Sequence, residues 1–139
     1  MIRRATIRDL DAIVALENAC FKVVDRESHE NLRISLLSKA NIFLIALHDG
    51  IVIGYSWVSC RRQTNLYSIC SIRHGFGHVL LAATESAVWK RGRRRLHLKV
   101  QVGNWRAIKL YERAGYKRLG DLKKYYGDGV TARRYAKWL

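Results

Sequence analysis

Two glycines separated by a single residue, Gly75 and Gly77, stand where an apolar run ends and an amphipathic run begins. The first N–H groups of a helix have no intrahelical acceptor and lie at the positive end of the helix dipole, so a turn at this place can bind an anion such as phosphate. Glycine lets the backbone approach a ligand closely, and Arg73 and His74 add positive charge just before the turn. A plain link between a strand and a helix has the same residue types, so both interpretations stay open from these residues alone.

Polar residues also alternate with apolar ones in the run "LHLKVQV". His97 and Lys99 are two residues apart, so they share one face of the expected strand. A histidine there can relay a proton through water, or it is an ordinary surface histidine on an alternating strand. Asn104 follows this strand and is a favourable N-cap for the next helix.

Three cysteines, Cys20, Cys60 and Cys70, lie in apolar stretches without regular spacing. An odd number of unpatterned cysteines predicts buried, reduced thiols, which are typical of a cytosolic protein. No spacing of cysteine and histidine indicates a metal site. We therefore expect no metal and a cytoplasmic location.

Hydrophobic periodicity and turn residues predict the elements that position these residues. In chain order they are a short strand at 2–6, a helix between Thr6 and Phe21, a weaker helix at 25–37, a hairpin at 41–60 that turns at 48–50, a strand at 66–72, a helix at 77–90, a strand at 96–102, a helix between Asn104 and Gly115, and two strands around a turn at 127–129. The order β-α-α-β-β-β-α-β-α-β-β predicts an α/β (α+β) fold, with a mostly antiparallel central sheet of mixed pairing flanked by helices, in a single domain of residues 1–139. The unit at 66–102 should contribute two parallel strands joined by a right-handed crossover.

The chain is strongly basic, with 26 lysines and arginines against 11 acidic residues and a net charge of +15. The electrostatic field of this net positive charge attracts polyanions, including nucleic acid, ribosomes, acidic proteins and phosphorylated cofactors. The run "RGRRR" at 91–95 is either a solvated turn or a contact for a cofactor phosphate or RNA. No apolar run approaches the ~20 residues of a membrane span, and the N-terminus does not resemble a signal peptide.

The segment "GNWRAIKLYERAGY" has the spacing N-x-x-A-x-x-L-Y-x-x-x-G-[FY]. With this motif, the chain resembles the GNAT superfamily of acetyl-CoA-dependent N-acetyltransferases over nearly its whole length, from "IRRATIRDLDAIVALENACF" to "ARRYAKWL". Within that superfamily it is most similar to the bacterial ribosomal-protein N-terminal acetyltransferase group. The resemblance implies acetyl-CoA as the acetyl donor and a GNAT-like sheet.

The resemblance also implies roles for individual residues. The strand before the glycine turn would splay from its neighbour and hold the acetyl carbonyl and the pantetheine arm with the backbone amides of Ile69, Cys70 and Ser71. The turn would wrap the pyrophosphate through Arg73, His74, Gly75, Phe76, Gly77 and His78. Asn104 would contact the pantetheine arm, and Tyr111 would protonate the departing thiolate, although Tyr111 also fits plain core packing. The acceptor site would involve His97, Lys99, Tyr125 and Tyr126, and the two tyrosines equally fit exposed aromatics of a hairpin.

Two departures from the family pattern bear on activity. The glycine turn is about four residues short, and Ile72 stands at the position of a usual glutamine or arginine. The group's catalytic glutamate in "LEVR" is replaced in "LKVQ" by Lys99. A neighbouring cation lowers the pKa of a substrate amine, which favours the neutral form, but it also repels the protonated form.

The sequence therefore predicts an N-acetyltransferase that moves an acetyl group from acetyl-CoA to a primary amine by direct attack in a ternary complex. A protein N-terminal α-amine is the preferred acceptor, since its pKa is lower than that of lysine. The alternative is a catalytically weakened module of the same fold that binds CoA, RNA or a ribosome through its basic surface. We expect a monomer or a homodimer.

Overall fold

The computed structural model describes residues 1–22 and 26–139. Its strands are β1 (Ile2–Arg4), β2 (Asn41–His48), β3 (Ile51–Cys60), β4 (Thr64–Ser71), β5 (Arg95–Gln101), β6 (Lys117–Leu122) and β7 (Ala132–Trp138). Its helices are α1 (Leu10–Cys20), α2 (His29–Leu37), α3 (Gly77–Lys90) and α4 (Trp105–Arg113), and a 3-10 turn, η1 (Ile7–Asp9), precedes α1. The expected element order is confirmed.

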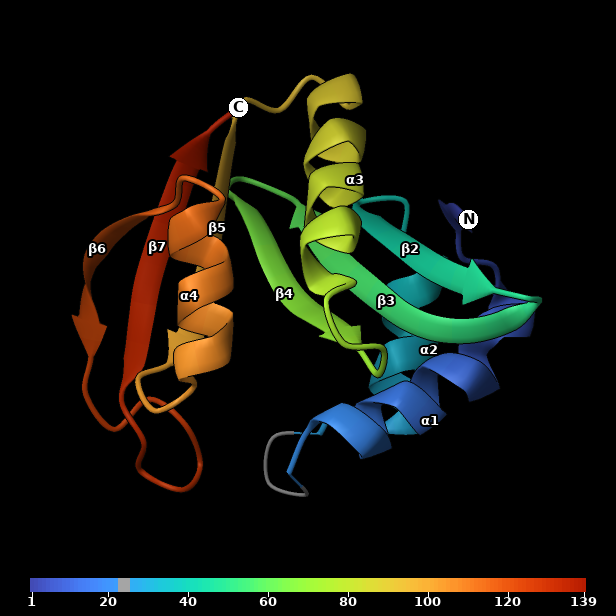
Figure 1. Ribbon diagram of the computed structural model, residues 1–139, viewed down its shortest axis with the longest axis horizontal. Coiled ribbons are helices and arrows are strands. Elements are labelled where there is room, and N and C mark those ends of the chain that lie inside the picture. Colours follow the sequence, from blue (N-terminus) through green and yellow to red (C-terminus); the bar gives the residue numbers. More distant parts are fainter. Residues whose placement is uncertain (23–25) are drawn as a thin grey trace.

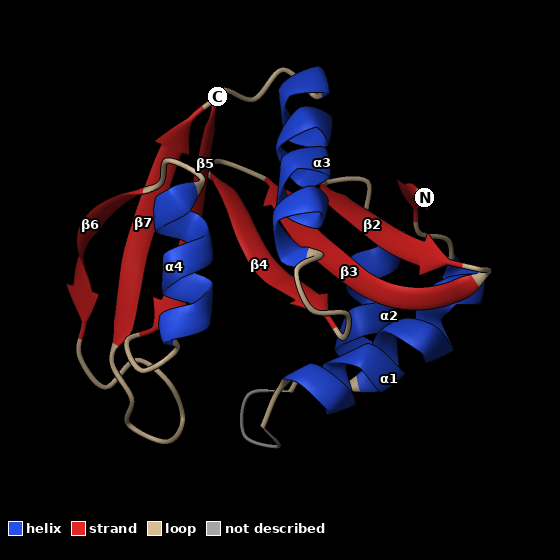
Figure 2. Ribbon diagram, in the orientation of Figure 1, coloured by secondary structure: helices blue, strands red, loops and turns tan. Residues whose placement is uncertain are grey.

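The strands form one sheet in the order β1-β2-β3-β4-β5-β7-β6. Every neighbouring pair is antiparallel except β4 and β5, which are parallel as the unit at 66–102 predicts. Helices α3 and α4 cover one face, and α1 and α2 cover the other face beneath β2, β3 and β4 (Figure 1). Among the described residues, no helix lies over the face of β5, β7 and β6 that is turned away from α4 (Figure 2).

Local sequence signals explain where the elements start and turn. Asp49 and Gly50 take the left-handed backbone conformation, with φ of 51° and 77°, that a tight hairpin turn between β2 and β3 requires. The hydroxyl of Ser28 accepts a hydrogen bond of 3.1 Å from the amide of Asn31, which caps α2. This helix therefore begins at His29, later than the expected 25–37, and Asp25 lies outside the described residues.

The cysteine prediction is wrong in part. Cys20, at the end of α1, and Cys70, in β4, form a disulfide with a Cα–Cα distance of 6.1 Å. Cys60 is free and buried, as expected. The sequence gives no sign of the pairing, since the two partners are 50 residues apart and meet only when α1 packs on the sheet. Reduced thiols therefore no longer support a cytosolic location.

Reduction of this disulfide is expected to lower the free energy of unfolding by about 2–4 kcal/mol. The bridge closes a loop of 50 residues in the unfolded chain, and a loop of that size restricts the unfolded ensemble by several kcal/mol. Urea unfolding with and without a thiol reductant measures the difference. A Cys20→Ser/Cys70→Ser variant is the control and should not respond to the reductant. Coincident curves for the oxidised and reduced wild-type protein contradict the prediction.

Candidate active site

Strands β4 and β5 pair over only a short stretch. The registered parallel pairs are Asn65 with His97 and Leu66 with Leu98, although β4 continues to Ser71. The two strands then diverge, and Figure 1 shows them opening like a V beside α4. Among the described residues, the edge of β4 that faces this opening has no registered strand partner beyond Leu66.

A β-bulge at Tyr67 accounts for the divergence. On the other edge of β4, Val58 pairs with Leu66 and Trp57 pairs with Ser68, so Tyr67 is left without an opposite residue. An extra residue of this kind bends the strand and increases its twist. The bulge thus turns the end of β4, with Ile69, Cys70 and Ser71, away from β5.

The glycine turn follows directly from this splayed end. Three of its backbone amides are engaged within the protein: Ile72 N donates to Ile53 O at 2.9 Å, Arg73 N to Ser71 Oγ at 3.2 Å, and Phe76 N to Arg73 O at 3.3 Å. Within residues 1–22 and 26–139, no acceptor is found for the amides of His74, Gly75, Gly77 and His78.

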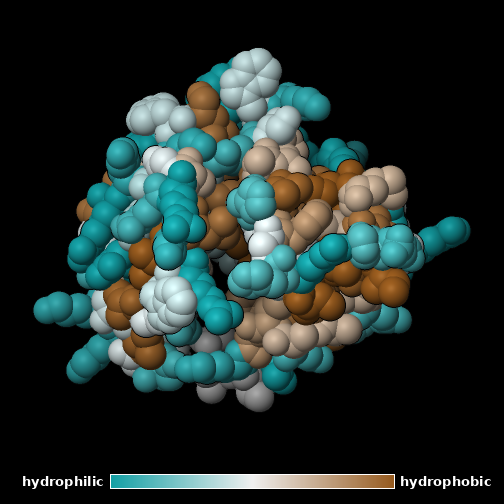
Figure 3. Space-filling model, viewed as in Figure 1, coloured by the Kyte–Doolittle hydropathy of each residue, from teal (hydrophilic) through white to brown (hydrophobic). Residues whose placement is uncertain are grey.

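The shape of the turn depends on its glycines. Gly75 has a φ of +78°, a conformation that side chains other than glycine rarely take. A Cβ at Gly77 would lie 3.4 Å from Leu110 Cδ2, so the start of α3 packs closely on α4. Figure 3 shows a hollow in the surface near the place where these two helices approach each other. The unbonded amides at the start of α3 can bind an anion there.

Helix α4 carries Asn104 and Tyr111. Asn104 Oδ1 accepts a hydrogen bond of 3.2 Å from Ala107 N and caps the helix, as expected. Tyr111 is buried, and its ring meets that of Tyr116 edge-on at 5.8 Å. Burial raises the pKa of Tyr111 above its ordinary value of 10.0, and Tyr126 raises it further. Tyr111 therefore stays protonated at neutral pH and is able to donate a proton.

His97 and Lys99 face the other side of β5. Leu98 and Val100, which alternate with them, join the core that contains Tyr111. Burial lowers the pKa of His97 below its ordinary 6.5, and nearby cations, chiefly Arg95, lower it further. Its Nδ1 is buried without a partner among the described residues. His97 is therefore neutral at physiological pH and able to accept a proton.

The loop between β6 and β7 brings Tyr125 to this same side. Lys99 Nζ lies 5.6 Å from the centre of the Tyr125 ring, and the rings of Tyr125 and Tyr126 meet edge-on at 5.1 Å. The structure thus brings Lys99 and Tyr125 together, although the sequence separates them. It places Tyr111 on the side of β5 opposite to Lys99 and Tyr125, while Tyr126 lies near enough to Tyr111 to raise its pKa.

Sequence reasoning missed Glu17 of α1, which is 1% exposed. Its carboxylate accepts hydrogen bonds from the Tyr55 hydroxyl and from Glu27 N, and it lies 3.5 Å from Ser68 Oγ. These contacts fix α1 against β3 and β4 beside the splayed strand. A glutamate on an otherwise apolar helical stripe is the signal that could have identified it.

Comparison with known proteins places these features in a family. A model described as "Acetyltransferase (GNAT) family" matches residues 10–116. An N-alpha-acetyltransferase of Saccharolobus solfataricus is 31% identical over 108 residues, which are 65% of this chain and 65% of the relative. An uncharacterized N-acetyltransferase of Methanocaldococcus jannaschii is 30% identical over 139 residues, covering 95% of this chain and 87% of the relative.

The fold has solved counterparts. A crystal structure of a ribosomal-protein-alanine N-acetyltransferase from Brucella melitensis superposes with a TM-score of 0.87 and 25% sequence identity. The superposition covers 100% of this chain and 99% of that protein. No helix within residues 1–22 and 26–139 is both long and apolar enough to cross a membrane.

Proposed function

Because this chain belongs to the GNAT acetyltransferase family and is therefore an acyltransferase that uses acetyl-CoA, we propose that its acceptor is the N-terminal α-amino group of a polypeptide. The names of two similar proteins support this choice, since one is an N-alpha-acetyltransferase and the other a ribosomal-protein-alanine N-acetyltransferase. The observation that carries the proposal is the opening between β4 and β5, which lies beside a turn whose amides have no acceptor among the described residues.

In this proposal, acetyl-CoA binds as a substrate from the side of α3 and α4. The amides of Gly75, Gly77 and their neighbours His74 and His78 hold the pyrophosphate, because unpaired N–H groups at a helix start favour anions. Arg73 and Phe76 also contact the pyrophosphate. The splayed strand, through Ile69, Cys70 and Ser71, holds the acetyl carbonyl and the pantetheine arm, which Asn104 also contacts.

Tyr111 acts as the general acid. The neutral acceptor amine attacks the thioester carbonyl carbon, a C–N bond forms, and the C–S bond breaks as the tetrahedral intermediate collapses. The Tyr111 hydroxyl donates its proton to the departing sulfur. Backbone N–H groups of β4 stabilise the negative charge that develops on the carbonyl oxygen.

The acceptor amine approaches from the opposite face, which carries His97, Lys99 and Tyr125. Tyr126 contacts Tyr125 and lies near Tyr111, so it borders both the acceptor and the acid. The positive charge of Lys99 destabilises a protonated amine beside it, and so favours the neutral amine. Neutral His97 accepts the proton that the amine releases, through water. An α-amine, with a pKa of about 8, loses its proton more readily than a lysine amine, with a pKa of about 10.4. The missing carboxylate at position 99 thus favours an α-amino acceptor.

Two short peptides distinguish the α-amine from a lysine amine. One has a free N-terminus and no lysine, and the other has a blocked N-terminus and a single internal lysine. Incubated with acetyl-CoA, the first is expected to gain one acetyl group by mass spectrometry and the second none. Acetylation of the blocked peptide at an equal rate contradicts the proposal.

The pH dependence of kcat/KM is expected to show a rising limb with a midpoint at about pH 8 and no fall below about pH 10. The rise reports deprotonation of the acceptor α-amine. Tyr111 must be protonated to act as an acid, and its raised pKa keeps it so beyond its ordinary 10.0. The pKa of His97 is lowered from its ordinary value of 6.5, so His97 adds no limb to the profile above that pH. A descending limb near pH 8 contradicts the assignment of Tyr111.

The alternative of a non-catalytic module is not favoured, because the matched family and the similar proteins are acetyltransferases. We propose that residues 1–139 act as a single catalytic domain. Whether the protein is a monomer or a homodimer stays a prediction. Contact with RNA is a separate proposal that does not require loss of activity.

A further inference from the structure

Two exposed tryptophans lie at the end of α3 and at the end of β7, and an arginine stacks on each. Arg94 lies 4.3 Å from the ring centre of Trp89, and Arg95 lies 4.9 Å from that of Trp138. The tryptophans are 52% and 71% exposed. Since α3 rises about 1.5 Å per residue, Trp89 is about 18 Å along the helix from the glycine turn. This surface is therefore separate from the proposed acetyl-CoA site.

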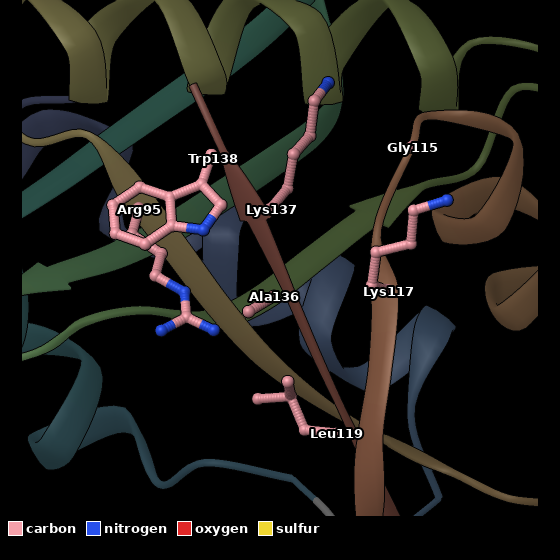
Figure 4. Close-up of a pocket in the computed structure, with 7 residues that line it drawn as sticks. All are labelled: Arg95, Gly115, Lys117, Leu119, Ala136, Lys137 and Trp138. Carbon is pink, nitrogen blue, oxygen red and sulfur yellow. The ribbon is translucent and has the colours of Figure 1, made fainter.

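A pocket of about 330 Å³ adjoins Trp138. Its lining residues are Arg95, Gly115, Lys117, Leu119, Ala136, Lys137 and Trp138. Figure 4 shows Ala136 between Arg95 and Trp138 on one side and Lys117 on the other. None of the lining residues is acidic, so the pocket presents only positive charge to a ligand.

The arginines that line the pocket or belong to the turn at 91–95 differ in their hydrogen-bond partners. Arg93 donates to Cys60 O at 2.6 Å and to Arg61 O at 2.7 Å, and Arg91 donates to Lys39 O at 3.0 Å. These two side chains fix the turn at 91–95 against its neighbours. Arg95 is different, because its Nε is buried and has no partner among the described residues.

Lys137 also lines the pocket, but its ammonium is held by Glu85 at 3.1 Å. Arg94 Nη1 donates to Trp89 O at 2.9 Å and to Arg93 O at 3.0 Å, so only the rest of its guanidinium is left for a ligand. The cations that can bind a ligand are therefore this part of Arg94, together with Arg95 and Lys117. We call these three residues, together with Trp89 and Trp138, the tryptophan–arginine surface. It combines spaced positive charges with exposed aromatic rings.

We infer that the tryptophan–arginine surface binds single-stranded RNA. The cations pair with backbone phosphates, and an unpaired base stacks on Trp138, whose ring is largely exposed. The buried Nε of Arg95 gains an acceptor when a phosphate enters the pocket. An acidic polypeptide would use the charges but would leave the exposed faces of the tryptophan rings, opposite the stacked arginines, without a partner. The net charge of +15 adds long-range attraction for a polyanion.

Fluorescence anisotropy with a labelled single-stranded RNA of mixed sequence tests this inference on the whole protein. Between about 50 and 200 mM salt, log affinity should fall linearly with log salt, with a slope of about −0.7 for each phosphate contact. An Arg94→Gln/Arg95→Gln variant should make the slope shallower by about 1.4 and weaken binding at low salt by at least tenfold, as about two contacts are lost. This variant is expected to change acetyl transfer as well, because Arg95 helps to lower the pKa of His97. Acetyl transfer to a peptide should be unchanged in the Lys117→Gln/Trp138→Leu variant, which keeps Arg95.

A matched control, Lys109→Gln/Arg113→Gln, removes the same charge from exposed positions on α4. It should weaken RNA binding by less than about twofold, since both residues lie outside the surface. A second variant, Lys117→Gln/Trp138→Leu, leaves the hydrogen bonds of the 91–95 turn in place and should weaken binding by at least about fivefold. Thermal unfolding monitors whether each variant is folded.

Three results overturn the inference. The first is no RNA binding at about 50 mM salt. The second is equal weakening by the surface variant and the α4 control, which indicates general electrostatic attraction only. The third is displacement of RNA by polyglutamate of equal charge as strongly as by unlabelled RNA, which indicates an acidic protein partner. Each of them leaves the acetyl-transfer proposal untouched, because the peptide assay measures that separately.

Discussion

Replacing Tyr111 with phenylalanine is expected to lower kcat by about 100-fold while the KM for acetyl-CoA changes little. The substitution removes the only proton that Tyr111 can give to the departing sulfur but keeps the buried ring against Tyr116. Because a thiol has a pKa of about 8.5, a thiolate is a good leaving group and gains only modestly from being protonated. The expected decrease in kcat therefore lies at the low end of the range for general acid catalysis. Steady-state kinetics with a free-amine peptide measures both constants.

Tyr135→Phe is the matched control for this substitution. Tyr135 belongs to the same buried core, and its hydroxyl donates to Glu112 of α4 at 2.9 Å. Loss of that hydrogen bond should reduce stability by about 1 kcal/mol and leave kcat nearly unchanged. Equal losses of kcat in the two variants, or none in Tyr111→Phe, assign Tyr111 to core packing alone.

Gly54→Ala is expected to destabilise the fold by about 3 kcal/mol and to weaken acetyl-CoA binding as well. A Cβ at Gly54 would lie 2.7 Å from the backbone oxygen of Cys70 and 3.4 Å from Leu80 Cδ2. A backbone atom in a paired strand moves only with the strand, so the clash is costly. It would displace the end of β4 that the proposal assigns to the acetyl and pantetheine groups. Urea unfolding and acetyl-CoA titration measure the two effects.

Gly127→Ala is the control for the Gly54 substitution. No atom lies within 4 Å of a Cβ built at Gly127, and its φ is not in the positive range. Its unfolding free energy should differ from that of the wild type by less than about 0.5 kcal/mol. A Gly54→Ala protein as stable as this control contradicts the packing argument.

Much of the fold was predictable because its signals are local. The helix at Gly77–Lys90 and the hairpin that turns at Asp49 and Gly50 lie where periodicity and turn residues place them. The parallel pairing of β4 and β5 followed from the strand–helix–strand order. These features depend on neighbouring residues, which a single sequence displays directly.

Features that depend on distant residues were not predictable. The disulfide joins Cys20 to Cys70, and the bulge at Tyr67 appears only when β4 pairs with β3. Stacking of Arg95 on Trp138 requires β5 and β7 to be neighbours, although the two residues are far apart in the chain. For the candidate site, the sequence named the turn and Tyr111, but the face on which each group lies follows from the sheet.

In the mechanism that we propose, the amides around Gly75 and Gly77 hold acetyl-CoA next to the splayed end of β4. Isothermal titration of the wild-type protein and of a Gly75→Val variant with acetyl-CoA tests it most directly. We expect saturable one-to-one binding by the wild type and an affinity lower by about tenfold or more in the variant, because valine cannot take a φ of +78° without strain. Absence of binding at about 1 mM acetyl-CoA, or equal affinity of the two proteins, contradicts the claim.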